Sequence, residues 1–114
     1  MSSRRKTRAT ALQILYEIDY TGHSAEEALA RLTSEKSLPQ EVYDFRKSLI
    51  QGVLLHKPRI DALIERFAPA FPIEQMPAID RNILRLAIFE ILFGGSSVKI
   101  AINEAVELAK TFGS

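Results

Sequence analysis

The sequence contains no cysteine among its 114 residues. This excludes a disulfide scaffold, a thiol nucleophile, an iron–sulfur cluster and any zinc site built from cysteine. The two histidines, His23 and His56, stand at no metal-ligand spacing, and we expect them at the surface or at helix ends. Gly94-Gly95 lacks the lysine and hydroxyl residue that complete a phosphate-binding loop. We therefore expect no metal, no cofactor and no enzymatic activity.

Long apolar runs are missing as well. No run approaches the ~20 residues needed to span a bilayer, and the opening Met-Ser-Ser-Arg-Arg-Lys does not lead into an apolar signal segment. The length is that of one domain, and a content of 46% hydrophobic and 25% charged residues is typical of globular chains. We expect a single domain over residues 1–114 in a soluble, cytoplasmic protein without membrane contacts.

Apolar residues recur at helical spacing almost throughout, and no stretch alternates for long enough to predict a strand. The fold class is therefore all-α, a compact bundle of about six helices. Glycine, proline and capping signals divide the chain into these helices. The predicted segments are a helix ending at Gly22, one opened by the Ser24/Glu27 capping box, one from Pro39 to Lys57-Pro58, a short one to Phe67, a proline-rich connector over 68–77, and helices over 78–93 and 98–112.

Positive charge is concentrated at one end of the chain. Arg4, Arg5, Lys6 and Arg8 form a basic arm, and no acidic residue precedes Glu17. The other eleven basic residues face fourteen acidic ones, so the body carries a charge of −3 against +4 on the arm. Cations at a helix N-terminus oppose the helix dipole. The arrangement thus favours an anionic partner such as RNA, and four phosphate contacts predict a salt slope of roughly −3.

Several other side chains have simpler interpretations. Tyr16 lies just off the apolar arc of the first helix, which favours the rim of the core. Asp80 is explained as an acid in the first turn of its helix, and Glu74 is expected to be exposed in the connector. Acidic pairs such as Glu104 with Glu107 are predicted to be solvent-exposed carboxylates.

Three blocks of sequence have a specific pattern of charged, polar and apolar residues. The N-terminal block is Arg-Arg-Lys-Thr-Arg-Ala-Thr-Ala-Leu-Gln-Ile-Leu-Tyr over residues 4–16. The second is Asp-Arg-Asn-Ile-Leu-Arg-Leu-Ala-Ile-Phe-Glu-Ile over 80–91, and the third is Ile-Ala-Ile-Asn-Glu-Ala-Val-Glu-Leu-Ala-Lys over 100–110. Together the three blocks resemble the NusB family of bacterial transcription antitermination factors. They stand in the family's order and at its separations, so the resemblance spans nearly the whole chain.

The resemblance implies two three-helix groups that share a core, and a role without catalysis. Members pair with NusE, a small-subunit ribosomal protein, and bind the boxA element of nascent RNA. With other Nus factors they keep RNA polymerase elongating through ribosomal-RNA operons. Carried over by position, Arg4, Arg5, Lys6 and Arg8 match the RNA contact, whereas Tyr16, Glu74 and Asp80 fall where the family meets NusE.

Two departures and two alternative functions accompany this interpretation. Ser97 replaces the family's usual proline, and the family's terminal helix with its F-[VI]-N-G-[VI]-L motif is not present, so we expect native sequence beyond Ser114. One alternative is the NusB-like RNA-binding domain of a ribosomal-RNA cytosine methyltransferase, against which the dense basic opening argues. The other is a homodimeric interaction module, in which the arm only aids solubility.

Overall fold

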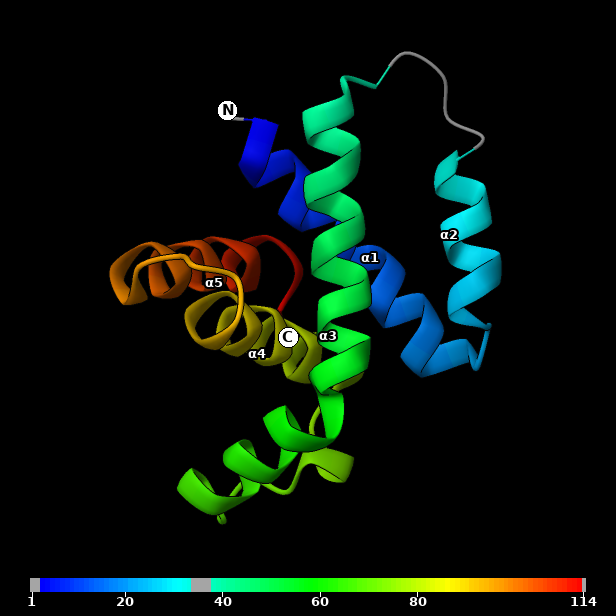
Figure 1. The fold of residues 1–114 in the computed structure, drawn as a ribbon. Helices are drawn as coiled ribbons and strands as arrows, with labels where there is room; N and C mark the ends of the chain where they lie inside the picture. Colours follow the sequence, from blue (N-terminus) through cyan, green and yellow to red (C-terminus); the bar gives the residue numbers. More distant parts are fainter. Residues whose placement is uncertain (1–2, 34–37, 114) are drawn as a thin grey trace.

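The computed structural model describes residues 3–33 and 38–113, and every regular element in these ranges is helical (Figure 1). The elements are α1 (Ser3–Thr21), α2 (Ala25–Thr33), α3 (Gln40–Phe67), a 3-10 turn η1 (Ile73–Gln75), α4 (Ala78–Leu92) and α5 (Val98–Phe112). The all-α prediction is therefore confirmed. The described ranges hold five α-helices, one fewer than the sequence pattern suggested.

The core is one cluster of buried side chains drawn from α1, α3, η1, α4 and α5. Helix α4 packs against α1, α3 and α5, and the apolar residues that make up most of its sequence suit this central position. Helix α1 passes across α3, and α2 packs back on α1 at the far side of the molecule (Figure 1). The largest side chains that are fully buried include Leu12, Leu15, Leu49, Ile50, Ile60 and Leu86.

The local signals set the helix boundaries as expected. Helix α1 ends before Gly22, whose φ of +76° is the left-handed conformation that glycine adopts without strain. The side-chain oxygen of Ser24 accepts a hydrogen bond of 3.1 Å from the amide of Glu27 at the start of α2. Ser97 caps α5 in the same way, by accepting from the amide of Ile100 at 3.1 Å.

The predicted break at Lys57-Pro58 is wrong, because α3 continues through Pro58 as one helix. Proline inside a helix costs about 3 kcal/mol. Val53 before it and Ile60 after it are both buried in the core, and each such burial contributes about 1.5–3 kcal/mol. Packing therefore offsets the local cost, and the last part of α3 runs in a different direction from the first (Figure 1).

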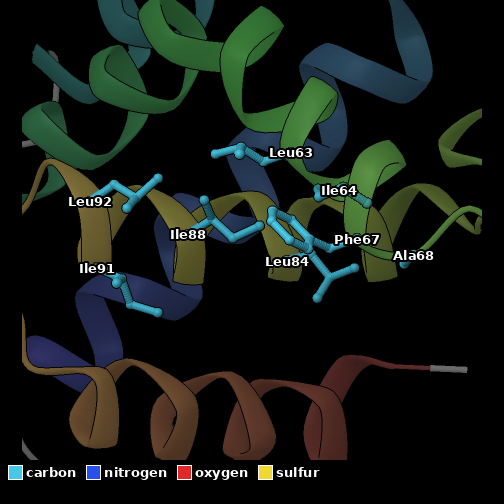
Figure 2. Close-up of a pocket in the computed structure, with 8 residues that line it drawn as sticks. All are labelled: Leu63, Ile64, Phe67, Ala68, Leu84, Ile88, Ile91 and Leu92. Carbon is cyan, nitrogen blue, oxygen red and sulfur yellow. The ribbon is translucent and has the colours of Figure 1, made fainter.

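One face of α4 stays open beside the second half of α3. A groove of about 410 Å³ lies between the two helices (Figure 2). Its lining is Leu63, Ile64, Phe67, Ala68, Leu84, Ile88, Ile91 and Leu92. Leu92 is 49% exposed, so α4 is not buried on all sides. Across residues 3–33 and 38–113, none of the helices has the length and apolar character that crossing a membrane requires.

Candidate nucleic-acid interface

The first two turns of α1 carry the basic arm, and the helix divides its four cations by direction. Arg4, Arg5 and Lys6 are exposed, whereas Arg8 is only 5% exposed. Arg8 stands three and four residues before the buried Ala11 and Leu12, so helical spacing places it on the core-facing side. The basic arm therefore has two parts, which are three exposed cations and one buried arginine.

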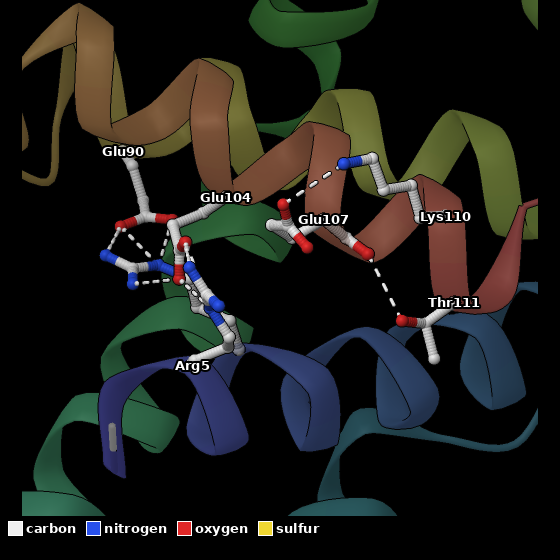
Figure 3. A network of polar contacts seen from close by, with 7 residues as sticks. Arg5, Glu90, Glu104, Glu107, Lys110 and Thr111 are labelled. Carbon is white, nitrogen blue, oxygen red and sulfur yellow. Dashed lines mark hydrogen bonds and ion pairs between the residues drawn. The ribbon is translucent and has the colours of Figure 1, made fainter. Parts of the chain in front are cut away.

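Arg8 is held by carboxylates from two other helices. These carboxylates belong to Glu90 and Glu104, which lie close together in Figure 3. The Nε and Nη2 of Arg8 donate to the two oxygens of Glu90 on α4, at distances between 2.7 and 3.0 Å. Its Nη1 donates to Glu104 on α5 at 3.2 Å. Ser96 completes the cluster by donating to Glu90 at 3.0 Å. A paired, hydrogen-bonded guanidinium of this kind joins α1, α4 and α5 at one point.

Arg5 shares Glu104 with Arg8 but from the solvent side. Its Nη2 donates to Glu104 Oε2 at 2.8 Å, and its Nε lies 3.2 Å from the same oxygen. The side chain of Arg5 remains 45% exposed, against 11% for Glu104. The hydrogen bond from Arg5, assisted by Arg8, holds the pKa of Glu104 below its ordinary value. Glu104 is thus a buried anchor for the arm, which corrects the prediction of an exposed carboxylate.

The remaining two cations face outward. Arg4 places its Cζ atom 4.1 Å from the ring centroid of Phe45 on α3, a cation–π contact that leaves the residue exposed. Lys6 is exposed on the adjacent face of the helix, beside a groove between α1 and α3. Arg4, Arg5 and Lys6 therefore form the exposed surface of the arm, and Arg8 supports it from below.

A second network lies at the other end of α1. Asp19 accepts from Arg81 Nε at 2.6 Å, from Asn82 Nδ2 at 2.9 Å and from Arg85 Nη1 at 3.0 Å. Burial alone raises the pKa of Asp19, but the hydrogen bonds from Arg81 and Asn82 outweigh it and bring the pKa to about 2. Arg85 also donates two hydrogen bonds to Asp61 on α3, at 2.8 and 2.9 Å. The start of α4 is thereby fixed to α1 and α3.

Comparison with known proteins gives this chain a family. The model of the NusB family matches residues 5–114. The transcription antitermination protein NusB of Dehalococcoides mccartyi (strain CBDB1) is 52% identical over 98% of this chain and 79% of its own length. The chain belongs to the NusB family. Membership confirms the expected resemblance and the expectation that the chain is not an enzyme.

Solved structures of NusB proteins share the fold. A NusB structure from T. maritima superimposes with a TM-score of 0.88 at 26% identity, and the match covers 100% of this chain and 81% of that one. A structure of antitermination factors NusB and NusE in complex with dsRNA gives a TM-score of 0.84 at 26% identity, over 98% of this chain and 84% of that one. The bundle described above is therefore the NusB fold.

The three residues that the NusB resemblance assigns to a protein partner lie on segments that Arg81 joins. Arg81 reaches Asp19, three residues after Tyr16 on α1, and donates to the carbonyl oxygens of Ile73 at 3.4 Å and Met76 at 3.2 Å, on either side of Glu74. Asp80 precedes Arg81 in the first turn of α4. Glu74 is exposed, and Tyr16 is half-buried and stacks on the exposed Tyr20 at 5.4 Å between centroids.

Sequence reasoning missed the acidic partners that organise both ends of α1 in this NusB-family chain. Glu90 and Asp19 were not singled out, and Glu104 was assigned to the surface. The available signal for Glu90 is a lone charge within the apolar last part of α4, where Ile88, Phe89, Ile91 and Leu92 flank it in sequence. Which cation pairs with it depends on the packing of helices far apart in sequence, which spacing does not show.

Proposed function

We propose that this chain is a transcription antitermination factor that acts in the cytoplasm. It binds boxA-type single-stranded RNA together with the ribosomal protein NusE, and it supports elongation by RNA polymerase through ribosomal-RNA operons with other Nus factors. The support is twofold. The similar D. mccartyi protein is a transcription antitermination protein, and the NusB neighbour of similar fold forms a complex with NusE and dsRNA.

The exposed cations at the start of α1 are the observation that carries the RNA-binding half of the proposal. Arg4, Arg5 and Lys6 project from the first turn of α1, where they can contact neighbouring phosphates of an RNA backbone. The sequence alone predicts four such contacts, but the guanidinium of Arg8 forms ion pairs with Glu90 and Glu104. Three contacts at ~0.7 each give a salt slope of about −2, in place of the roughly −3 expected from the sequence.

Removing the two exposed cations that do not touch Glu104 tests this surface directly. The double variant Arg4→Ala/Lys6→Ala is expected to bind single-stranded RNA about tenfold more weakly at low salt, because two phosphate contacts are lost. The matched control is Arg59→Ala/Arg66→Ala, which removes two exposed cations from the second half of α3. Fluorescence anisotropy with a labelled boxA-type RNA measures both affinities.

The control separates a local contact from a general charge effect. We expect Arg59→Ala/Arg66→Ala to keep wild-type affinity within about twofold, since the second half of α3, which carries both residues, lies far from the start of α1 (Figure 1). Equal losses in the two double variants mean that net charge, and not the arm, governs binding. That outcome rejects the arm as the RNA contact.

For the protein partner, we propose a surface formed by Tyr16, Glu74 and Asp80. Their segments meet at Arg81, and a surface that offers an exposed acid and an aromatic pair suits a basic partner such as a ribosomal protein. Glu74→Ala should weaken NusE binding about fivefold in isothermal titration calorimetry, with RNA affinity of the free chain unchanged. The control is Glu41→Ala, an exposed acid in the first turn of α3. Unaltered NusE affinity in Glu74→Ala removes this residue from the interface.

A further inference from the structure

A groove separates the first turns of α1 from the start of α3, directly beside the exposed arm. Its volume is about 330 Å³, at the lower end of small-ligand sites. The lining is Lys6, Thr7, Thr10, Leu38, Pro39, Val42 and Arg46. Lys6 belongs both to this groove and to the exposed arm, so a strand held by the arm passes the mouth of the groove.

The groove combines an apolar wall with a polar edge. Leu38, Pro39 and Val42 supply aliphatic surface from the α3 side. Opposite them, the α1 side supplies Lys6, Thr7 and Thr10. Flat rings of unpaired bases bury well against such surfaces, and single-stranded RNA offers bases that can turn out of the strand. An open groove of this size holds one base, with the sugar and phosphate outside.

The polar groups determine which base fits. Lys6 and Arg46 carry donors and no acceptor. The hydroxyl of Thr10 donates to the carbonyl oxygen of Lys6 at 3.1 Å, which leaves its oxygen able to accept a hydrogen bond. Two residues that donate and one hydroxyl that accepts match in kind the edge of uracil, where two carbonyl oxygens flank one N–H. Cytosine has an amino group in place of one oxygen and an unprotonated ring nitrogen in place of the N–H.

The lining of the groove between α3 and α4 has no side chain that could form a hydrogen bond with a base. Its eight lining side chains are all apolar, and its cavity lies against the second half of α3 (Figure 2). A base placed there would leave its polar edge without hydrogen bonds, which is unfavourable for a buried polar group. Of the two grooves, only the one between α1 and α3 combines base-sized space with groups that read a base edge.

We propose that the groove between α1 and α3 is a seat for one uracil base of the bound RNA. The proposal rests on the proposed function, because the exposed arm must first hold the strand by its phosphates. The arm then supplies affinity that is independent of sequence, and the groove supplies part of the discrimination between bases. Uracil stacks along Val42 and Pro39 while Lys6, Thr10 and Arg46 face its edge.

Three strands of equal length test the seat without any change to the protein. They are oligouridylate, oligocytidylate and a strand of abasic units with the same number of phosphates. Fluorescence anisotropy competition is expected to rank uridylate about tenfold tighter than cytidylate, from one discriminated base edge. The abasic strand should bind at least tenfold more weakly than uridylate, from the loss of base burial.

Two variants place this discrimination in the groove. Thr10→Val removes the acceptor and keeps the shape, and Val42→Trp fills the space; both should bind uridylate and cytidylate equally while still binding the abasic strand as the wild type does. The matched control is Leu55→Trp, an exposed position on α3, which should retain the full preference. Circular dichroism confirms that each variant is folded, and Thr10→Val covers the case in which the bulkier change disturbs packing.

The outcomes separate the seat from the arm. Equal binding of all three strands by the wild type, with salt dependence intact, overturns the uracil seat and leaves the arm contact standing. A uridylate preference that survives both groove variants places the reading of bases elsewhere and also overturns the seat. No binding of any strand at low salt overturns both the seat and the proposed function.

Discussion

Arg8→Ala is expected to lower the free energy of unfolding by about 3–5 kcal/mol, the range for breaking a buried ion pair by removing one partner. The side chain of Arg8 is 6% exposed and that of Glu90 is 4% exposed, so the carboxylate left behind has little access to water. Glu104 keeps Arg5 as a partner, whereas Glu90 loses its guanidinium partner and keeps the neutral hydroxyl of Ser96. Urea unfolding followed by circular dichroism measures the change.

Two controls identify the cause of that loss. Lys6→Ala, an exposed cation in the same helix, should change stability by no more than about 0.5 kcal/mol. The double variant Arg8→Met/Glu90→Met should recover much of the stability lost in Arg8→Ala, because apolar residues of similar volume replace the pair without a stranded charge. If Arg8→Ala is as stable as the wild type yet loses RNA affinity, Arg8 contacts RNA directly and its assignment to the interior is wrong.

Asp19→Asn is expected to destabilise the fold by about 2 kcal/mol at pH 7. The pKa of Asp19 is lowered to about 2 from 3.8, and each unit of a pKa difference is worth 1.36 kcal/mol. Its side chain is 14% exposed, so solvent screens the network only weakly. The effect should exceed that of a surface ion pair, because Arg81, Asn82 and Arg85 all donate to this one carboxylate.

The same shift predicts how stability depends on pH. A carboxyl whose pKa is lower in the folded state stabilises the protein above its unfolded pKa, near 4, and this contribution is lost as the pH falls toward 2. Asp19→Asn should therefore flatten the stability curve between about pH 4 and pH 2. The control is Asp44→Asn, which changes an exposed aspartate that accepts a hydrogen bond from Gln40. If the stability of Asp19→Asn depends on pH in the same way as that of the wild type, another group causes the acid sensitivity.

Helix positions were predictable because their signals are local. Gly22 ends α1, Ser24 caps α2, and the segment from Ala78 to Leu92, in which most residues are apolar, forms the helix that joins the other elements. The failure at Pro58 has a tertiary cause, since buried residues on both sides of the proline keep α3 continuous. Local propensity predicts a break at such a point, and only the assembled core reverses it.

The sequence shows which residues make up the basic arm, but it does not show which of their side chains point outward and which point into the core. The basic arm could be found by counting charges, yet the count treated its four cations alike. Helical geometry turns Arg8 inward toward Glu90, whose position 82 residues later in the chain gives no sign of contact. The groove beside Lys6 likewise depends on how α1 meets α3, and Leu38, Pro39 and Val42 have no special pattern in the sequence. Contacts between segments that lie far apart in the sequence are therefore the part of the site that the sequence does not predict.

The salt dependence of RNA binding tests the central claim most directly, namely that exposed cations on α1 hold the phosphates while Arg8 supports them from the interior. The observed association constant is measured with a boxA-type RNA over a series of salt concentrations. We predict a slope of about −2 for the wild type and about −1 for Arg4→Ala/Lys6→Ala. A slope near zero for the wild type, or identical slopes for the two proteins, contradicts the account.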